Sequence, residues 1–186
     1  MNNIAEAIHG HVSKHVLEDD GLFPNNQIYP LLVYKGAVHL LPGDEPESIL
    51  NLFESNNWTN GWKDGICDYD HYHSLTHEAL AVFSGTADVH LGGPSGVTLQ
   101  LTRGDLIIIP AGVAHRSMNA STDFLCVGAY PEGKHYDMRY GKQEEWNEAI
   151  ENIKNVAIPQ TDPVYGSNGG LLEFWHTETN VKSNHF

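Results

Sequence analysis

Hydrophobic and polar positions divide the chain into a strand-rich middle region and two flanks with longer periods. Between residues 65 and 129, short apolar runs alternate with Gly, Pro, Asn and Ser. Runs of this length, rich in β-branched residues and bounded by turn residues, predict the strands of an antiparallel barrel or sandwich. No internal repeat is present, so a single barrel is expected. The predicted strands are 78–83, 87–91, 97–102, 106–109 and 124–129.

The flanks add helices around this region. A helix is expected over about 46–55, opening on Pro46 and capped by Asp44 or Glu45, because proline is favoured in a first helical turn. A second helix is expected over about 143–155, where apolar residues recur on one helical face.

The two ends of the chain are less regular. In residues 3–17 apolar side chains recur every four positions, which predicts a helix, although Val16 and Leu17 also fit the start of a strand. Residues 31–34 predict a strand, and residues 171–175 fit a last strand returning to the sheet. The expected organisation is an N-terminal segment (1–30) on or near the barrel, a barrel with peripheral helices (31–175) and a C-terminal tail (176–186).

Composition and charge narrow the class of protein. With 186 residues, 40% of them hydrophobic and 18% charged, the chain is expected to form one globular domain. A formal charge of −14 argues against nucleic acid or an anionic membrane as a partner. The chain has no apolar run long enough to span a bilayer, no signal-peptide pattern at its start and only 2 cysteines. We therefore expect a cytoplasmic protein whose partner is a small molecule.

Three histidines and one glutamate are candidate metal ligands. His71 and His73 are two residues apart, so on a strand both rings leave the same face. Glu78 follows a turn into the next strand, and His115 follows a Pro/Gly turn at 110–112. Imidazole nitrogens with one carboxylate suit a divalent transition metal such as Zn, Fe, Mn or Ni. The four side chains are expected to converge on one such ion.

Further side chains are candidates to act beside that ion. Cys67 and Tyr69 share the strand parity of the first two histidines and are expected to face the cavity. His77 precedes Glu78, so alternation sends it to the opposite face and outside the ligand set; an irregular turn would leave it as a rival ligand or an orienting partner. These three are the candidate catalytic residues. Candidates for holding a polar or anionic group of a substrate are Tyr130, Tyr136 and Arg139.

The segments that carry these residues match a known pair of motifs. Residues 65–85 fit G-x5-H-x-H-x3,4-E-x6-G, and residues 104–119 fit G-x5-P-x-G-x2-H-x3-N, with every fixed position present. Both resemble the two cupin motifs, and the chain from about Gly21 to Trp175 further resembles bacterial single-domain cupins of the YjlB type. The resemblance implies an all-β double-stranded β-helix (a jelly-roll barrel) with a few peripheral helices, and a homodimer. It also implies that the ligands on the inner wall are His71, His73, Glu78 and His115.

Two functions of different class follow from these expectations. The first is a metal-dependent enzyme acting on a small soluble metabolite, either as a Lewis-acid isomerase or epimerase or as an Fe(II) dioxygenase. The third histidine departs from the usual two-histidine, one-carboxylate iron set and weakens the dioxygenase analogy. The alternative is a non-catalytic small-molecule-binding module. Because regulatory modules often carry a DNA-binding helix pair or basic patch, and the sequence predicts neither, the enzyme is the favoured interpretation.

Overall fold

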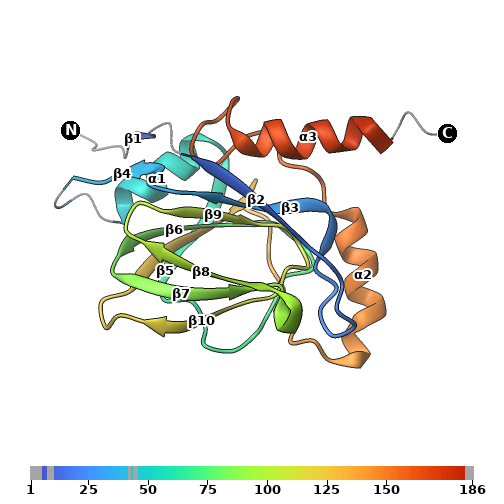
Figure 1. Ribbon diagram of the computed structural model, residues 1–186. Coiled ribbons are helices and arrows are strands. Elements are labelled where there is room, and N and C mark those ends of the chain that lie inside the picture. The colour runs from blue at the N-terminus through green and yellow to red at the C-terminus, as the bar shows by residue number, and fades with distance from the viewer. Residues whose placement is uncertain (1–5, 8–10, 42, 44–45, 183–186) are drawn as a thin grey trace.

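Two antiparallel sheets facing each other form the core of the protein (Figure 1). The computed structural model describes residues 6–7, 11–41, 43 and 46–182. The larger sheet has the strand order β2-β3-β9-β6-β11-β5, the smaller sheet has the order β10-β7-β8, and β1 and β4 form a separate pair. In the larger sheet the strands are β2 (Val12–Leu17), β3 (Asn26–Tyr34), β9 (Leu106–Ile109), β6 (Glu78–Ser84), β11 (Leu125–Pro131) and β5 (Trp58–Asp64). The remaining strands are β10 (His115–Ala120), β7 (Thr86–Leu91), β8 (Val97–Thr102), β1 (Glu6–Ala7) and β4 (Val38–His39).

Helices cover the outer face of the larger sheet and one end of the molecule (Figure 1). Helix α1 (Glu47–Ser55) and helix α3 (Gly170–Lys182) pack on the larger sheet, and α2 (Trp146–Asn155) follows the short 3-10 turn η2 (Gln143–Glu145). A further 3-10 turn, η1 (Gly93–Ser95), joins β7 to β8. No helix in the described part of the chain has the length and apolar composition to cross a membrane.

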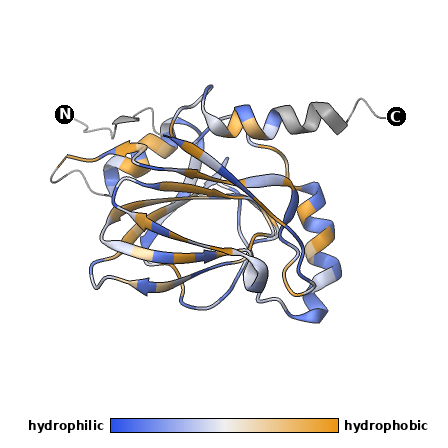
Figure 2. Ribbon diagram, in the orientation of Figure 1, coloured by the Kyte–Doolittle hydropathy of each residue, from blue (hydrophilic) through white to orange (hydrophobic). Residues whose placement is uncertain are grey.

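Burial on both faces explains the continuous apolar runs of the central strands. Along β9, Ile107 packs into the core between the two sheets, whereas Ile108 packs against the helices on the other side. Strand β6 alternates in the same way, with Leu80 facing the smaller sheet and Ala81 facing the helices. A strand covered on both faces has no solvent side, so it lacks the apolar–polar alternation of an exposed sheet. Figure 2 shows these hydrophobic strands in the interior and mixed colouring on α2.

The predicted all-β core with a few helices is confirmed. Strands 97–102 and 106–109 have the predicted bounds, and 78–83, 87–91 and 124–129 lie within two residues of β6, β7 and β11 at each end. Four strands were not predicted: the two-residue strands β1 and β4, and the edge strands β5 and β10, on each of which several residues are exposed. An edge strand gains its stability from pairing along one side, so its sequence needs no strong apolar signal.

Two predictions about the ends of the chain are wrong. Residues 12–17 form strand β2, not a helix, because their backbone pairs with β3; tertiary pairing overrides a weak helical period. The predicted strand 171–175 is the first part of α3. Leu171 and Trp175 are four residues apart and both fully buried, which is the spacing of one helical face. The remainder of the predicted N-terminal helix (3–5, 8–10) and the proposed caps Asp44 and Glu45 lie outside the described residues.

Candidate metal centre

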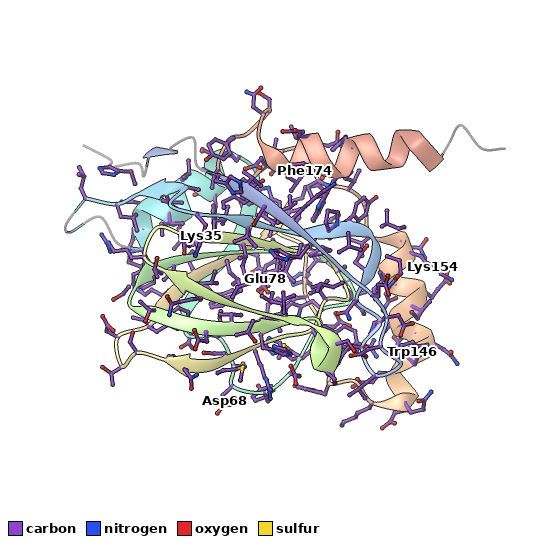
Figure 3. The ribbon with its side chains drawn as sticks, in the orientation of Figure 1. Lys35, Asp68, Glu78, Trp146, Lys154 and Phe174 are labelled. Atoms are coloured by element: carbon purple, nitrogen blue, oxygen red, sulfur yellow. The ribbon has the colours of Figure 1, made fainter. Side chains whose placement is uncertain are left out.

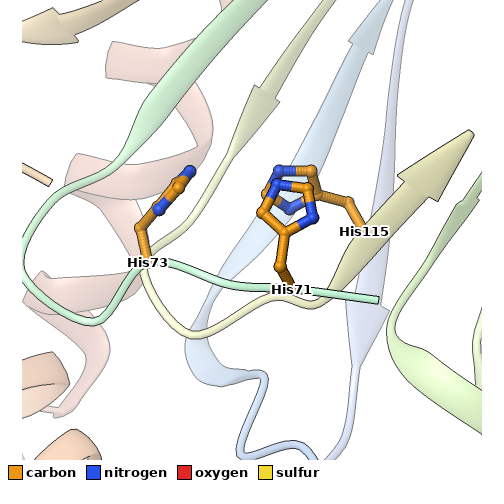
Figure 4. A group of neighbouring side chains, drawn as sticks. All are labelled: His71, His73 and His115. Atoms are coloured by element: carbon orange, nitrogen blue, oxygen red, sulfur yellow. The ribbon is translucent and has the colours of Figure 1, made fainter. Parts of the chain in front are cut away.

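Backbone pairing brings the two histidine segments together. His71 and His73 lie in the extended stretch between β5 and β6, and the backbone N–H of each of His71 and His115 donates to the carbonyl of the other, at 3.2 and 2.9 Å. Glu78 is the first residue of β6 and His115 the first residue of β10. Figure 3 places Glu78 in the interior of the barrel, and Figure 4 shows the rings of His71 and His115 overlapping in the view, with the ring of His73 beside them.

The four side chains form a compact, buried cluster. The candidate ligand nitrogens of His71, His73 and His115 all lie within 4.8 Å of one another. Glu78 Oε2 lies 3.4 Å from Nε2 of His73 and 3.4 Å from Nε2 of His115. Each of the four residues is at most 5% exposed. The structure therefore brings together all four residues that the sequence analysis selected as ligands.

Hydrogen bonds to the backbone determine which nitrogen of each imidazole is free. Nδ1 of His71, His73 and His115 lies 3.1, 2.5 and 3.1 Å from the carbonyl oxygens of Tyr69, Asp137 and Val113 respectively. A carbonyl oxygen only accepts, so each Nδ1 carries the proton and donates it. In the neutral rings Nε2 then holds the lone pair, which is the form that binds a metal. Each of the three rings, when neutral, is therefore held in this form.

The second carboxylate oxygen of the cluster, Oε2 of Glu78, also supports a metal site. Glu78 Oε2 is buried and has no hydrogen-bond partner among the described residues. An unsatisfied buried carboxylate oxygen is costly, and its nearest neighbours are lone-pair nitrogens 3.4 Å away. Two ligand atoms about 2.1 Å from one ion are about 3.0–3.4 Å apart in octahedral or tetrahedral geometry. The donor set, and the distances from Glu78 Oε2 to the two rings, therefore fit a divalent transition metal.

Burial and mutual charge shift the pKa values within the cluster. Burial, followed by the neighbouring His115, lowers the pKa of His71 to about 3. Burial by itself lowers the pKa of His73, but the Glu78 carboxylate outweighs it and the net pKa is raised. Burial by itself raises the pKa of Glu78, but His73 and His115 outweigh it and the net pKa is well below its ordinary value. Glu78 is thus an anion at neutral pH and can act as a charged ligand.

The other carboxylate oxygen of Glu78 is held by a chain of two aromatic residues. The hydroxyl of Tyr130, on β11, donates to Glu78 Oε1 at 2.9 Å, and Nε1 of Trp62, on β5, donates to that hydroxyl at 2.8 Å. Burial, with the nearby Glu78 carboxylate, raises the pKa of Tyr130, so its hydroxyl stays protonated. These two hydrogen bonds fix the orientation of the Glu78 carboxylate from the side of the larger sheet.

A cavity of about 290 Å³ opens beside this cluster. Its wall includes the four candidate ligands together with residues of β5, of the 65–67 stretch and of the 136–138 segment. Much of the lining is aromatic or aliphatic, with a lysine and an aspartate also present. The side chains that give the cavity this character are Trp62, Lys63, Asp64, Ile66, Leu80 and Met138.

Of the three predicted catalytic candidates, Cys67 alone lines this cavity, as a free and partly exposed thiol. Tyr69 is 48% exposed, and its ring lies beside His71 with 5.7 Å between centroids. His77 is on the outer face of the large sheet, where its ring packs 4.7 Å from Trp175 and its Nδ1 accepts the Ala111 N–H at 3.0 Å. The structure therefore does not bring His77 to the cavity.

The three predicted substrate-binding residues have different surroundings. Tyr130 and Tyr136 both line the cavity, and their rings stack with centroids 4.9 Å apart. Arg139 does not line it: Nε lies 2.7 Å from Asp137 Oδ2 and Nη1 lies 3.0 Å from Glu148 Oε2. Its charge is engaged by these two carboxylates, which organise the 136–139 segment.

Sequence reasoning missed three residues that shape the site. Trp62 lies on the unpredicted edge strand β5, and Asp137 and Met138 lie in a segment without periodicity. The one available signal was an aromatic residue flanked by polar ones at 62, which indicates a half-buried edge position. No local signal identifies Asp137, because His73 and Ser74, which it holds, are more than 60 residues away in the chain.

Comparison with known proteins identifies relatives of this chain. The Cupin domain family matches residues 63–128. The uncharacterized protein YjlB of Bacillus subtilis (strain 168) is 39% identical over 157 residues, covering 84% of this chain and 92% of that protein.

Solved structures give more distant similarities. The TDP-quinovose 3,4-ketoisomerase WlaRB of Campylobacter jejuni has 17% identity and a TM-score of 0.40, covering 50% of this chain and 75% of that one. A DUF861 family protein of Thermotoga maritima has 22% identity and a TM-score of 0.32, covering 45% of this chain and 89% of that one. The 39% identity to YjlB over most of both proteins, together with the Cupin domain match and the two motifs, shows that the chain belongs to the cupins, in the YjlB group.

Proposed function

We propose that this cupin is a metal-dependent enzyme acting on a small soluble metabolite. The ion would be a divalent transition metal held by His71, His73, Glu78 and His115. The observation that carries the proposal is the convergence of three imidazoles and one buried carboxylate oxygen that has no hydrogen-bond donor among the described residues. Because each Nδ1 is engaged by a carbonyl, every Nε2 presents its lone pair to the same space.

When bound, such an ion supplies either Lewis-acid polarisation of a substrate oxygen or, as Fe(II), redox chemistry with O2. The chain itself contributes binding and exclusion of water. Trp62, Tyr136 and Met138 form an apolar wall beside the ligands. The Tyr130 hydroxyl is committed to Glu78 and so orients that carboxylate. Cys67 is the candidate for holding or moving a proton, since its thiol lines the cavity.

The size of the cavity supports a small substrate. About 290 Å³ lies at the lower end of the roughly 300–1,000 Å³ typical of small-molecule sites.

The proposal also includes a cytoplasmic homodimer. Strands β2 and β5 end the larger sheet, and edges of this kind need a cover against unwanted pairing. Sedimentation velocity of the purified chain tests the dimer directly, and a monomer at all concentrations would contradict it.

A second candidate function is a binding module without turnover. The observation that favours it is the commitment of the Tyr130 hydroxyl to Glu78 and the placement of His77 on the other face of the sheet. Both positions leave few groups free for proton transfer in the cavity. Ligand screening by thermal shift, followed by product analysis with each ligand that binds, separates the two functions.

The first test is elemental analysis of protein purified anaerobically without chelators. We expect near-stoichiometric metal in the wild type and in His90→Ala, and its loss in His73→Ala. His90 is a suitable control because its ring bonds Thr98 and Gly93 and does not line the cavity. Iron would direct the search to oxygen-consumption assays, and zinc, manganese or nickel to isomerase assays. Failure of the wild type to retain or take up any of these metals would refute the proposal.

A further inference from the structure

One residue far from the ligands in sequence holds the loop that carries His73. The backbone carbonyl of Asp137 accepts the Nδ1 proton of His73, at 2.5 Å. Its carboxylate accepts the backbone N–H groups of Ser74 and Leu75 at 2.7 and 3.1 Å, and the Ser74 hydroxyl at 2.6 Å. Asp137 therefore contacts a candidate ligand and the two residues that follow it, through main chain and side chain together.

The same carboxylate is anchored from the opposite side. Nε of Arg139 lies 2.7 Å from Asp137 Oδ2, and Nη1 of Arg139 lies 3.0 Å from Glu148 on α2. Asn152, also on α2, donates to the Ser74 hydroxyl at 3.0 Å. The Asp137 and Arg139 side chains are 17% and 15% exposed. Helix α2 thus supports both the carboxylate and the loop that it holds.

The neighbours of Asp137 form part of the cavity wall. Tyr136 packs edge-on against His73 with 5.0 Å between ring centroids, and it stacks on Tyr130. Met138 lines the cavity on the other side of Asp137 in sequence. A shift of Asp137 would consequently move the His73 ring and this wall together.

We propose that Asp137 is a positioning residue for the metal centre, which fixes the ring of His73 through its carbonyl and the 73–75 turn through its carboxylate. The inference rests on the proposed function in that His73 is a metal ligand. A carbonyl acceptor selects the imidazole form with the lone pair on Nε2. That carbonyl stays in place because the carboxylate of the same residue is fixed by donors on both sides.

The test compares Co(II) binding by the wild type, Asp137→Ala and Asp137→Asn. Titration with Co(II) gives the affinity of each protein, and the visible absorption of the bound ion reports its coordination. Loss of an orienting partner of a metal ligand typically lowers metal affinity about 10–100-fold, and we expect this for Asp137→Ala. Asp137→Asn should lose less, because its amide oxygen can still accept from the backbone N–H groups of Ser74 and Leu75. Both variants should also shift the absorption bands, since the His73 ring would be reoriented.

Asp70→Asn is the matched control for loss of a negative charge near the site. Asp70 precedes His71 and lies 3.7 Å from Arg116, and no contact joins its carboxylate to a ligand ring. We expect its Co(II) affinity and spectrum to stay close to those of the wild type. An equal loss of affinity in Asp70→Asn and Asp137→Asn would overturn the proposal, because charge alone would then explain the effect.

A second measurement on the metal-free protein separates this proposal from the proposed function. Proton–nitrogen NMR correlations of the imidazoles report which nitrogen of His73 carries the proton. At a pH where the His73 ring is neutral, the wild type should show it protonated at Nδ1, and Asp137→Ala should show a mixture of the two neutral forms. This measurement needs no bound metal. If the wild type binds no metal but the two proteins differ in this way, the metal-dependent function is refuted and the positioning role of Asp137 is not. A folded Asp137→Ala or Asp137→Asn protein with an unchanged His73 ring and unchanged Co(II) affinity refutes the positioning role.

Discussion

Replacing Tyr130 by phenylalanine removes a single hydroxyl from the interior of the site. That hydroxyl donates to Glu78 Oε1 at 2.9 Å and accepts from Trp62 Nε1 at 2.8 Å, in a ring that is 1% exposed. A hydrogen bond to a charged group contributes about 1.5–3 kcal/mol. We therefore expect Tyr130→Phe to lower the unfolding free energy of the metal-free protein by about 2 kcal/mol. In a domain of this size that corresponds to a fall in Tm of about 4–8 °C.

The same substitution should weaken metal binding. Without the hydroxyl, Glu78 loses the donor that orients its carboxylate, and the loss of such a partner costs about 10-fold or more in metal affinity. The assays are urea unfolding in the presence of a chelator, for stability, and competitive Zn(II) titration, for affinity. Both are measured on the same protein preparations.

Tyr136→Phe provides the control for this pair of measurements. Tyr136 stacks on Tyr130 and is 45% exposed, and its hydroxyl makes no hydrogen bond among the described residues. We expect this variant to match the wild type within about 0.5 kcal/mol, as is usual for exposed positions. If the two variants behave alike in both assays, the Tyr130 hydroxyl does not hold Glu78, and the reasoning about the aromatic chain is wrong.

Three further predictions concern the framework around the site. Gly128→Ala would place a Cβ 2.2 Å from Trp62 Cε2, so we expect overpacking to cost about 1–3 kcal/mol in thermal unfolding; an unchanged Tm would contradict this close approach. Asp162→Ala should cost about 3 kcal/mol or more in urea unfolding, since it leaves the buried Tyr34 hydroxyl and three backbone N–H groups without an acceptor. Burial raises the pKa of Asp162 above its ordinary 3.8, so wild-type stability should fall as the pH rises from about 4 through the folded-state pKa. Asp162→Asn, measured over the same pH range, should lack that fall, and a parallel fall in both proteins would refute the assignment.

Local patterns in the sequence were sufficient to predict the central strands and the four candidate ligands. Strands 97–102 and 106–109 have the predicted bounds because turn residues limit each apolar run on both sides. The spacing of His71 and His73, and the turns before Glu78 and His115, predicted that these four side chains would meet. These features depend on short-range sequence order, which turn chemistry and strand parity translate into direction.

Tertiary structure decided the rest, since it depends on contacts between distant residues. Pairing with β3 made residues 12–17 a strand, and burial against that strand made 171–175 a helix. Asp137 reaches His73 only because the chain returns past the barrel after β11. Which nitrogen of each imidazole is free likewise depends on a nearby carbonyl whose position the folded backbone sets. The sequence alone therefore determined the fold class and the four candidate ligands, because both follow from local patterns, whereas packing determined how those four side chains are held.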